Sequence, residues 1–306
     1  MASLWMLFAT FAFAAMGVCV KLASSLYSTS EIVMYRGLIG TVLLLALMRH
    51  QGGTLRTAYR GAHLWRSFIG AVSLWLWFYA IAKLPLATAV TLNYMAPIWI
   101  AFFLFCAGWW QSGNRIEWPL IGAILMSFAG VTLVLRPAVQ AQQLAGAAVG
   151  LLSSVISAMA YMQVRRLGQL GEPEYRVVFF FSAMSIAAGV FGALVLEGRD
   201  GPAFHAHTAH GAALLLAAGV LALCAQMAMT RAYRVGKVLV VANLQYTGII
   251  FSSIWGVIVW HDRFDWHVWL GMLVILLSGV AATFYNTRST PQGAAVSTTD
   301  PIASEL

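Results

Sequence analysis

The chain has 306 residues, of which 61% are hydrophobic and only 9% are charged, and its mean hydropathy is +0.80. Soluble domains carry roughly a quarter charged residues, so this composition excludes an ordinary water-soluble fold. The net charge of +8 comes from basic residues scattered between apolar runs, without the basic stripe and aromatic platform of a nucleic-acid-binding protein.

Ten apolar runs follow one another along the chain. Most reach the roughly 20 residues that a helix needs to cross the hydrocarbon core of a bilayer. The sequence therefore predicts an all-α membrane protein with ten transmembrane helices, followed by a disordered cytoplasmic tail over 287–306. The runs cover residues 3–24, 31–48, 63–82, 86–108, 116–135, 146–166, 175–196, 210–232, 238–260 and 268–286.

The distribution of Lys and Arg predicts the orientation. Five fall on one side of the membrane, Arg36 stands alone inside the second run, and twelve fall on the side of the amino terminus. Because basic loops are retained in the cytoplasm, we expect a multi-pass protein of the inner membrane with both termini cytoplasmic. The twelve are Arg49, Arg56, Arg60, Arg66, Arg115, Arg165, Arg166, Arg176, Arg231, Arg234, Lys237 and Arg288.

The two halves of the chain resemble each other weakly but in order, which predicts one five-helix repeat over 3–135 and a second over 146–286. Five is an odd number, so the second copy enters the membrane from the opposite face. Such inverted repeats are typical of secondary transporters, whose substrate site lies near the midplane. The matches are Ala80 with Ala232, Asn93-Tyr94 with Gln245-Tyr246, Gly122 with Gly271, and Gly130-Val131 with Gly279-Val280.

Three stretches carry a family resemblance: 31–36 at the start of the second run, 78–97 across the third and fourth, and 122–137 across the fifth. With them the chain resembles, over nearly its whole length, EamA-type ten-helix transporters of the drug/metabolite transporter superfamily. The resemblance implies metabolite transport by alternating access, with helices 5 and 10 outside a cavity formed by the other eight. The chain departs from the family pattern in two places, because it lacks an acid near Trp109-Trp110 and has Phe179 where the first repeat has Arg36.

Arg36 is the sharpest candidate for a functional residue. A guanidinium inside an apolar helix costs roughly 2.5–3.5 kcal/mol on insertion scales unless it is paired or hydrated. Glu31 lies on the same helix and Lys21 lies near the end of the first run, so a structural ion pair or an arginine that snorkels to the headgroups is one interpretation. The other is a direct role in gating or in holding an anionic group of the substrate.

Amides and aromatic residues inside the runs complete the candidate site. A buried amide must face protein or a wet cavity, so these amides serve either as interhelical hydrogen-bonding groups or as substrate contacts. Pro97 in the same fourth run as Asn93 fits either a kink beside a cavity or a tolerated proline. The predicted substrate-binding residues are Arg36, Trp75, Tyr79, Asn93, Tyr94, Tyr161, Gln226, Gln245 and Tyr246.

Motifs of catalysis and metal binding are missing. The sequence has no GxSxG, HExxH or Gly-rich phosphate loop, so we predict neither an enzyme nor a cofactor. Three cysteines without CxxC spacing suggest buried apolar side chains rather than zinc ligands. His205, His207 and His210 are compatible with a metal site or with plain solvation, and we predict no metal. Coupling through a deep carboxylate is not expected, which leaves uniport, exchange or coupling through Glu31 open.

The sequence as a whole predicts a secondary transporter for small polar or amphipathic metabolites. Amino acids and their derivatives come first as cargo, and nucleobase- or vitamin-like compounds come second. The alternatives are a membrane channel or receptor, and an intramembrane enzyme that modifies lipids. We expect a small-molecule substrate and the lipid bilayer as partners, and no nucleic acid. We expect a monomer, and a homodimer is the alternative.

Overall fold

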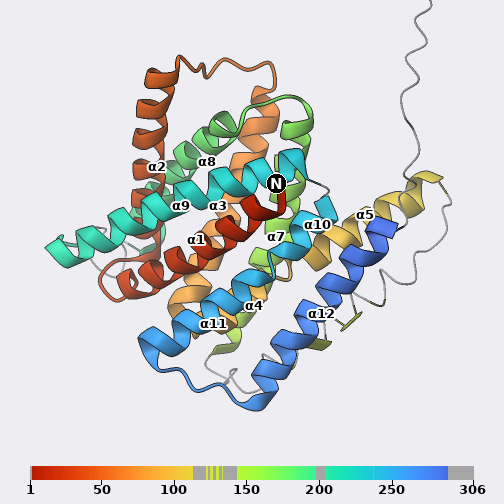
Figure 1. Ribbon diagram of the computed structural model, residues 1–306. Helices are drawn as coiled ribbons and strands as arrows, with labels where there is room; N and C mark the ends of the chain where they lie inside the picture. Colours follow the sequence, from red (N-terminus) through yellow and green to blue (C-terminus); the bar gives the residue numbers. More distant parts are fainter. Residues whose placement is uncertain are drawn as a thin grey trace, which may run out of the picture.

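The computed structural model describes residues 2–112, 143–197, 204–236 and 238–288, together with isolated positions between 122 and 133. Over these residues the chain is helical and contains no strand (Figure 1). The elements are α1 (Ala2–Ala23), α2 (Thr29–Gln51), α3 (Arg60–Lys83), α4 (Leu86–Asn93), α5 (Ala96–Ser112), α7 (Leu144–Gln169), α8 (Glu174–Phe191), the π-helical turn η2 (Gly192–Glu197), α9 (Ala209–Val235), α10 (Val238–Leu244), α11 (Thr247–Trp260) and α12 (Trp266–Arg288).

Seven helical stretches within the described residues are long and apolar enough to cross a membrane. Shorter apolar helices cover Ala96–Cys106 and Trp266–Ser278. The predicted helix over 116–135 and most of the tail lie outside the described residues, apart from isolated positions of the former. The prediction of an all-α membrane protein is therefore confirmed, and the count of ten helices stays a prediction. The spans are Ser3–Ala23, Thr29–Gln51, Arg60–Lys83, Leu144–Gln169, Glu174–Val195, Ala209–Val235 and Val240–Trp260.

The structure corrects two of the predicted helices, because 86–108 and 238–260 are each broken near their first third. The turn at Tyr94-Met95 separates α4 from α5, and the turn at Gln245-Tyr246 separates α10 from α11. Pro97 has no backbone N–H to bond the carbonyl of Asn93, which accounts for the first break. The second break has no proline, and there the Gly248 N–H bonds the Gln245 carbonyl three residues back.

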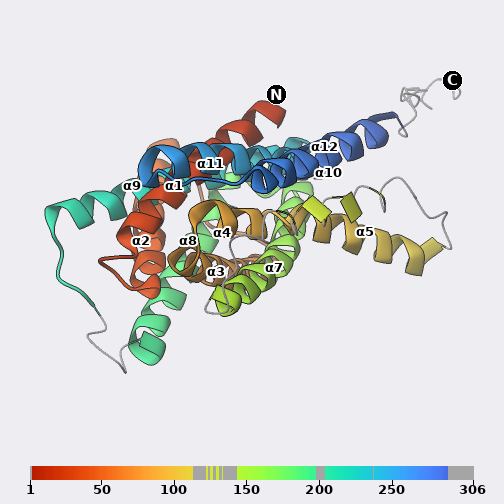
Figure 2. The ribbon, with the colours of Figure 1, turned by 90° about the horizontal axis from the view of Figure 1, so that it is seen from below.

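The main helix contacts join the first part of the chain to the second. Helix α1 packs along α9, α2 along α8, and α3 along α7 and α8. Figures 1 and 2 show α1 beside α9 from two directions. The α2–α8 interface is close because Gly189 has no side chain. A Cβ there would lie 2.6 Å from the backbone nitrogen of Met34.

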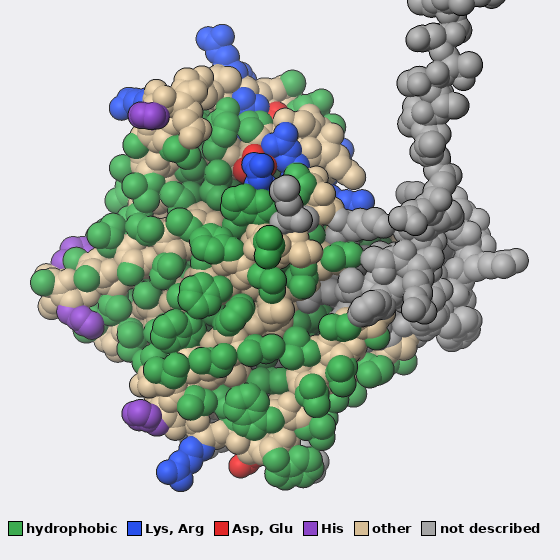
Figure 3. Space-filling model, viewed as in Figure 1, with side chains coloured by type: hydrophobic (Ala, Val, Ile, Leu, Met, Phe, Trp, Pro, Cys, Tyr) green, Lys and Arg blue, Asp and Glu red, His purple; other side chains and the backbone are tan. Residues whose placement is uncertain are grey.

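The outer surface is largely apolar. Figure 3 shows hydrophobic side chains over the middle of one face, with most of the charged residues gathered near its upper and lower ends. Large side chains such as Leu4, Phe8, Leu216 and Leu273 are about half exposed or more. An apolar surface of this kind is suited to contact with lipid tails. On a water-soluble protein the same surface would cause aggregation.

Candidate functional site

A small cavity with both polar and apolar walls lies between helices of the two halves. The space open to the centres of water molecules is about 40 Å³, which holds a few waters and is smaller than a metabolite site. Helix α3 contributes one stripe of its surface, with positions 66, 70, 73, 74 and 77 recurring at helical spacing. The lining is Phe13, Arg36, Arg66, Gly70, Ser73, Leu74, Trp77, Asn93, Ser157, Ala160, Tyr161, Phe181 and Gln226.

Two arginines dominate the charge of this cavity. Arg36 and Arg66 are only 4% and 2% exposed, and among the described residues neither forms an ion pair with a carboxylate. Both guanidiniums contact the ring of Phe181, at 5.0 and 4.4 Å from its centroid. Gly70 leaves room for Arg66, since a Cβ at that position would collide with Arg66 Nη1.

The opposite polar group is a cluster of hydroxyls around Asn93, the last residue of α4. Asn93 Oδ1 accepts hydrogen bonds from Ser153 Oγ at 3.2 Å and from Ser157 Oγ at 3.3 Å. Ser73 of α3 joins the same cluster, because Ser153 Oγ donates to its carbonyl at 2.9 Å. The broken helix is thereby bonded to α7, and the Asn93 amide is held at the wall of the cavity.

A row of aromatic and amide groups continues from the cavity into the second half. The Tyr161 ring stacks on Tyr233 with centroids 5.7 Å apart, and Gln245 Nε2 donates to Tyr233 Oη at 2.7 Å. Gln226 is buried, and its Nε2 has no hydrogen-bond partner among the described residues. The amide of Gln226 is therefore free to bond water or a bound molecule.

The structure brings together four of the predicted site residues, namely Arg36, Asn93, Tyr161 and Gln226. Trp75 lies elsewhere, because its indole donates to Ser30 Oγ at 2.9 Å and lines a separate apolar pocket of about 320 Å³ between α3 and α8. The Tyr79 ring stacks on Trp75 along that same face of α3.

Three further predicted residues lie outside the lining of the cavity and pack around the two helix breaks. Tyr94 packs against Gly248, where a Cβ would collide with its hydroxyl, and this contact joins the first break to the second half. Gln245 is one step removed from the cavity, since Tyr233 stands between it and Tyr161. Tyr246 is a buried core residue.

Sequence reasoning missed Arg66, Ser73, Trp77 and Phe181. Arg66 was counted as a basic residue of a cytoplasmic loop, whereas it lies in the second turn of α3 and is fully enclosed. The available signal was the stripe of Arg66, Gly70, Ser73 and Trp77 at helical spacing. No signal pointed to Phe181, whose contact with both arginines depends on tertiary packing.

The charge cluster of Arg36 with Glu31 and Lys21, one of the two interpretations of Arg36, does not form. Ser28 caps α2, and Glu31 at the third helical position accepts from the Ser28 backbone in return, as in a capping box. Glu31 also accepts from the backbone N–H of His205 at 2.8 Å and pairs with its Nδ1 at 2.6 Å. Lys21 Nζ donates to carbonyls at the end of α3, 2.7 Å from those of Ile81 and Leu84.

The histidines of the loop before α9 are held by protein groups. His207 bonds the hydroxyls of Tyr27 and Tyr35, at 3.1 and 2.8 Å. Within the described residues no three His, Cys, Asp or Glu side chains gather where they would hold a metal ion. These contacts fasten the loop onto the beginning of α2.

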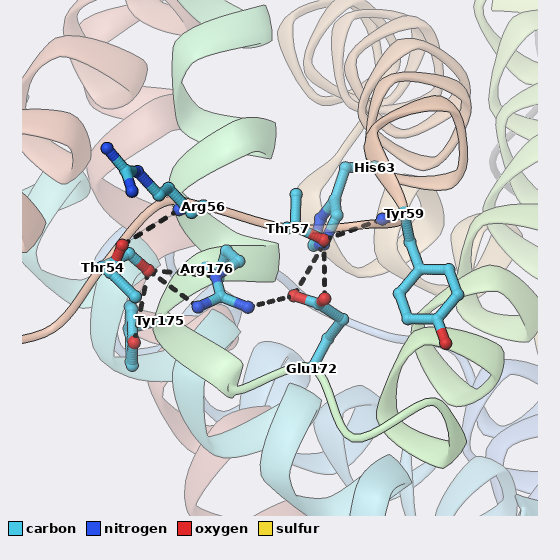
Figure 4. A network of polar contacts seen from close by, with 8 residues as sticks. All are labelled: Thr54, Arg56, Thr57, Tyr59, His63, Glu172, Tyr175 and Arg176. Carbon is cyan, nitrogen blue, oxygen red and sulfur yellow. Dashed lines mark hydrogen bonds and ion pairs between the residues drawn. The ribbon is translucent and has the colours of Figure 1, made fainter.

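A second polar network, shown in Figure 4, joins the segment between α2 and α3 to the turn between α7 and α8. Glu172 accepts from Thr57 Oγ1 at 2.6 Å and from Arg176 Nη1 at 2.8 Å, and it lies 3.0 Å from Nε2 of the buried His63. Arg176 also donates to the Thr54 carbonyl at 2.8 Å. We call these residues the Glu172 clamp.

The clamp sets the ionisation of Glu172. Burial opposes the charged form, but hydrogen bonds from Thr57, Arg176 and His63, with the charge of Arg176, outweigh burial and hold the pKa of this carboxyl below its ordinary value of 4.5. Glu172 is therefore ionised at neutral pH and joins the two halves of the chain at one end of the helix bundle.

The comparison with known proteins agrees with this architecture. The model of the EamA-like transporter family matches residues 1–136 and 144–284. The chain belongs to the EamA-like transporter family. It is 33% identical to the pseudopaline exporter CntI of Pseudomonas aeruginosa over 275 residues, which cover 89% of this chain and 92% of that one. It is 26% identical to the riboflavin transporter of Vibrio cholerae over 298 residues, covering 94% of each chain.

A solved crystal structure shares the fold, with a TM-score of 0.70 at 18% identity, covering 94% of this EamA-like chain and 98% of the other. The family and its relatives identify a transporter of the drug/metabolite superfamily and not an enzyme. The chain is thus a multi-pass membrane protein that acts on small molecules.

Proposed function

We propose that this EamA-like protein is a secondary transporter that moves small polar or amphipathic metabolites across the inner membrane by alternating access, with the cavity around Arg36 and Asn93 as the substrate site. The observation that carries the proposal is a small cavity between the halves whose lining includes two buried arginines without an ion pair and the Gln226 amide, whose Nε2 has no partner among the described residues. A purely structural core would leave such groups uncompensated at considerable cost.

The helix contacts support an inverted-repeat mechanism. If α1, α2 and α3 correspond to α7, α8 and α9, then the α1–α9 and α3–α7 interfaces are the same pair with the halves exchanged, and α2–α8 pairs equivalent helices. The two helix breaks fall at matching positions, and broken helices often mark the substrate site in transporters built from inverted repeats. Rocking of one half against the other then exposes the cavity to each side in turn.

The size of the cavity indicates a constricted state. A volume of about 40 Å³ admits waters only, so cargo binding requires the halves to separate. We propose the monomer as the transporting unit, since helices from both halves of one chain line the cavity. Aromatic walls from Trp77, Tyr161 and Phe181 suit a cargo with an apolar part, while the amides and arginines suit its polar ends.

Amino acids and their derivatives remain the first cargo class, with nucleobase- or vitamin-like compounds second. Two relatives, a pseudopaline exporter and a riboflavin transporter, support organic metabolites in general as cargo. Purified protein in liposomes should move at least one member of a radiolabelled metabolite panel with saturable kinetics. A flux that never saturates would favour a channel, and chemical conversion of the compound would favour an enzyme.

Matched tyrosine variants test the site itself. Tyr161→Phe removes a hydroxyl that lines the cavity, whereas Tyr79→Phe removes one that lies on the far face of α3. We expect Tyr161→Phe to lower transport about tenfold, the cost of one lost hydrogen bond to bound cargo, and Tyr79→Phe to leave transport unchanged. The reverse order of effects would move the site away from this cavity.

The proposed orientation places both termini in the cytoplasm. Single cysteines at the exposed positions Ala58 and Ala206, in a chain lacking Cys19, Cys106 and Cys224, distinguish the two sides. In whole cells, a membrane-impermeant thiol reagent should label Ala206→Cys and spare Ala58→Cys. Labelling of Ala58→Cys alone would show the opposite orientation in the membrane, and the proposal of transport would still stand.

A further inference from the structure

We infer that the cargo of this cavity is an organic anion whose carboxylate is held by the guanidiniums of Arg36 and Arg66. The inference rests on the proposed transport function and specifies its substrate class. It depends on the pair of buried arginines that the described residues leave without a counter-ion.

Several cations elsewhere in the described residues have oxygen acceptors. Arg176 pairs with Glu172 at 2.8 Å, and Arg234 pairs with Glu174 at 3.0 Å. Lys21 bonds the carbonyls that end α3. The two cavity arginines differ from these three cations, because they are almost fully buried and form no ion pair among the described residues.

Three of the six guanidinium nitrogens of this pair are buried without a hydrogen-bond partner among the described residues. Arg36 Nε, together with Arg66 Nε and Nη1, has no hydrogen-bond partner within the described residues although each atom is buried. A guanidinium presents donors in a planar fork that matches the two oxygens of a carboxylate. Burying an N–H group without an acceptor costs free energy, and the oxygens of bound cargo would supply the missing acceptors.

The ring of Phe181 positions the two guanidiniums. Both guanidiniums stand at the ring of Phe181, which partly compensates their charge without using their in-plane N–H donors. The absence of a side chain at Gly70 lets Arg66 occupy its place. Phe181 and Gly70 therefore hold two cations close together while leaving their N–H groups for a ligand.

The rest of the lining decides the net charge of the cargo. No carboxylate lines the cavity, so nothing there offers an ion pair to an ammonium group. Two cationic groups with no acidic counterpart favour a molecule with net negative charge over a zwitterion or a cation. Trp77 and Tyr161 provide apolar surface for the remainder of the molecule.

The test compares compounds that differ only at the acid group. Wild-type protein is reconstituted in liposomes and given N-acetylated amino acids, their primary amides, the parent zwitterions and phosphate-bearing analogues of similar size. Uptake and thermal stabilisation of purified protein are both measured. We expect the N-acetyl acids to be transported and to stabilise the protein, and the amides to bind at least tenfold more weakly, as the loss of charged hydrogen bonds implies.

Variants connect the effect to the residues. Arg66→Gln and Arg36→Gln should each weaken the binding of carboxylates about 10- to 100-fold. They should also reduce the difference in affinity between each acid and its amide. Arg66→Lys should recover part of the loss, and Arg60→Gln on the exposed start of α3 is the matched control that should behave as wild type. Monodisperse gel-filtration profiles establish that each variant is folded.

Each outcome decides between the claims. Transport of amides or phosphate-bearing compounds in preference to the acids, or full retention of acid selectivity in both glutamine variants, would overturn the carboxylate inference while transport itself stands. If no compound of any class is transported by folded protein, the proposed function fails as well.

Discussion

Replacing Glu172 by glutamine tests the clamp that joins the two halves. The carboxylate accepts from Thr57 and Arg176 and contacts buried His63, and an amide NH₂ in place of one oxygen can no longer accept from Arg176. Loss of one hydrogen bond to a charged group costs about 1.5–3 kcal/mol. Since Arg176 keeps its bonds to the Thr54 carbonyl, we expect a loss of about 2 kcal/mol.

The assay is thermal unfolding of purified protein in detergent, followed by tryptophan fluorescence. A loss of about 2 kcal/mol should lower the midpoint by about 3 °C, because an unfolding entropy of about 2.1 cal/mol/K per residue sums to about 640 cal/mol/K over 306 residues. Asp265→Asn, at an exposed acid before α12, is the matched control and should change the midpoint by less than about 1 °C. Equal midpoints for Glu172→Gln and wild type would refute the account of the clamp.

The same carboxylate predicts a dependence on pH. Its pKa in the folded protein lies below the ordinary value of 4.5, so its contribution is fully present above about that value and is lost as pH falls through the lower folded pKa. The difference in midpoint between wild type and Glu172→Gln should therefore be constant near neutrality and shrink in acid. A difference that grows as the pH falls would contradict this sign.

Three further substitutions test other parts of the structure. Gly70→Ala should displace the Arg66 guanidinium and reduce transport in liposomes severalfold, whereas Gly61→Ala, with open space around it, should leave transport unchanged. Gly189→Ala should force α2 and α8 apart and cost about 1–3 kcal/mol in thermal unfolding, and a neutral result would contradict the close contact. Lys21→Met should leave the carbonyls at the end of α3 without their donor. We expect a loss of about 1–3 kcal/mol in thermal unfolding.

The membrane-spanning elements were predictable because apolar run length is a property of the sequence alone. The runs at 3–24, 146–166 and 210–232 lie within α1, α7 and α9 apart from a residue at the end of the first. The breaks inside 86–108 and 238–260 were harder to predict. Pro97 indicates the first break. The second break has no proline, and its local change in backbone hydrogen bonding lies within an apolar run that carries no sequence signal for it.

The site was only partly predictable because helix phase is not fixed by one sequence. A rotation of 100° per residue places Trp75 and Trp77 on nearly opposite faces of α3, and the prediction chose the residue that faces away. Arg36 was found from its isolation in an apolar run. Arg66 was not, since its nearness to the helix start resembled a loop, and its meeting with Arg36 at Phe181 arises from packing between distant helices.

Counterflow in liposomes tests the central claim most directly, because only a carrier with alternating access exchanges one bound molecule for another. Liposomes are loaded with a high concentration of unlabelled carboxylate, chosen from the acid panel, and diluted into a trace of the labelled compound. We predict that the label accumulates transiently above its external concentration, and that Arg66→Gln abolishes this overshoot. Simple equilibration of the label without an overshoot would contradict alternating access through this cavity.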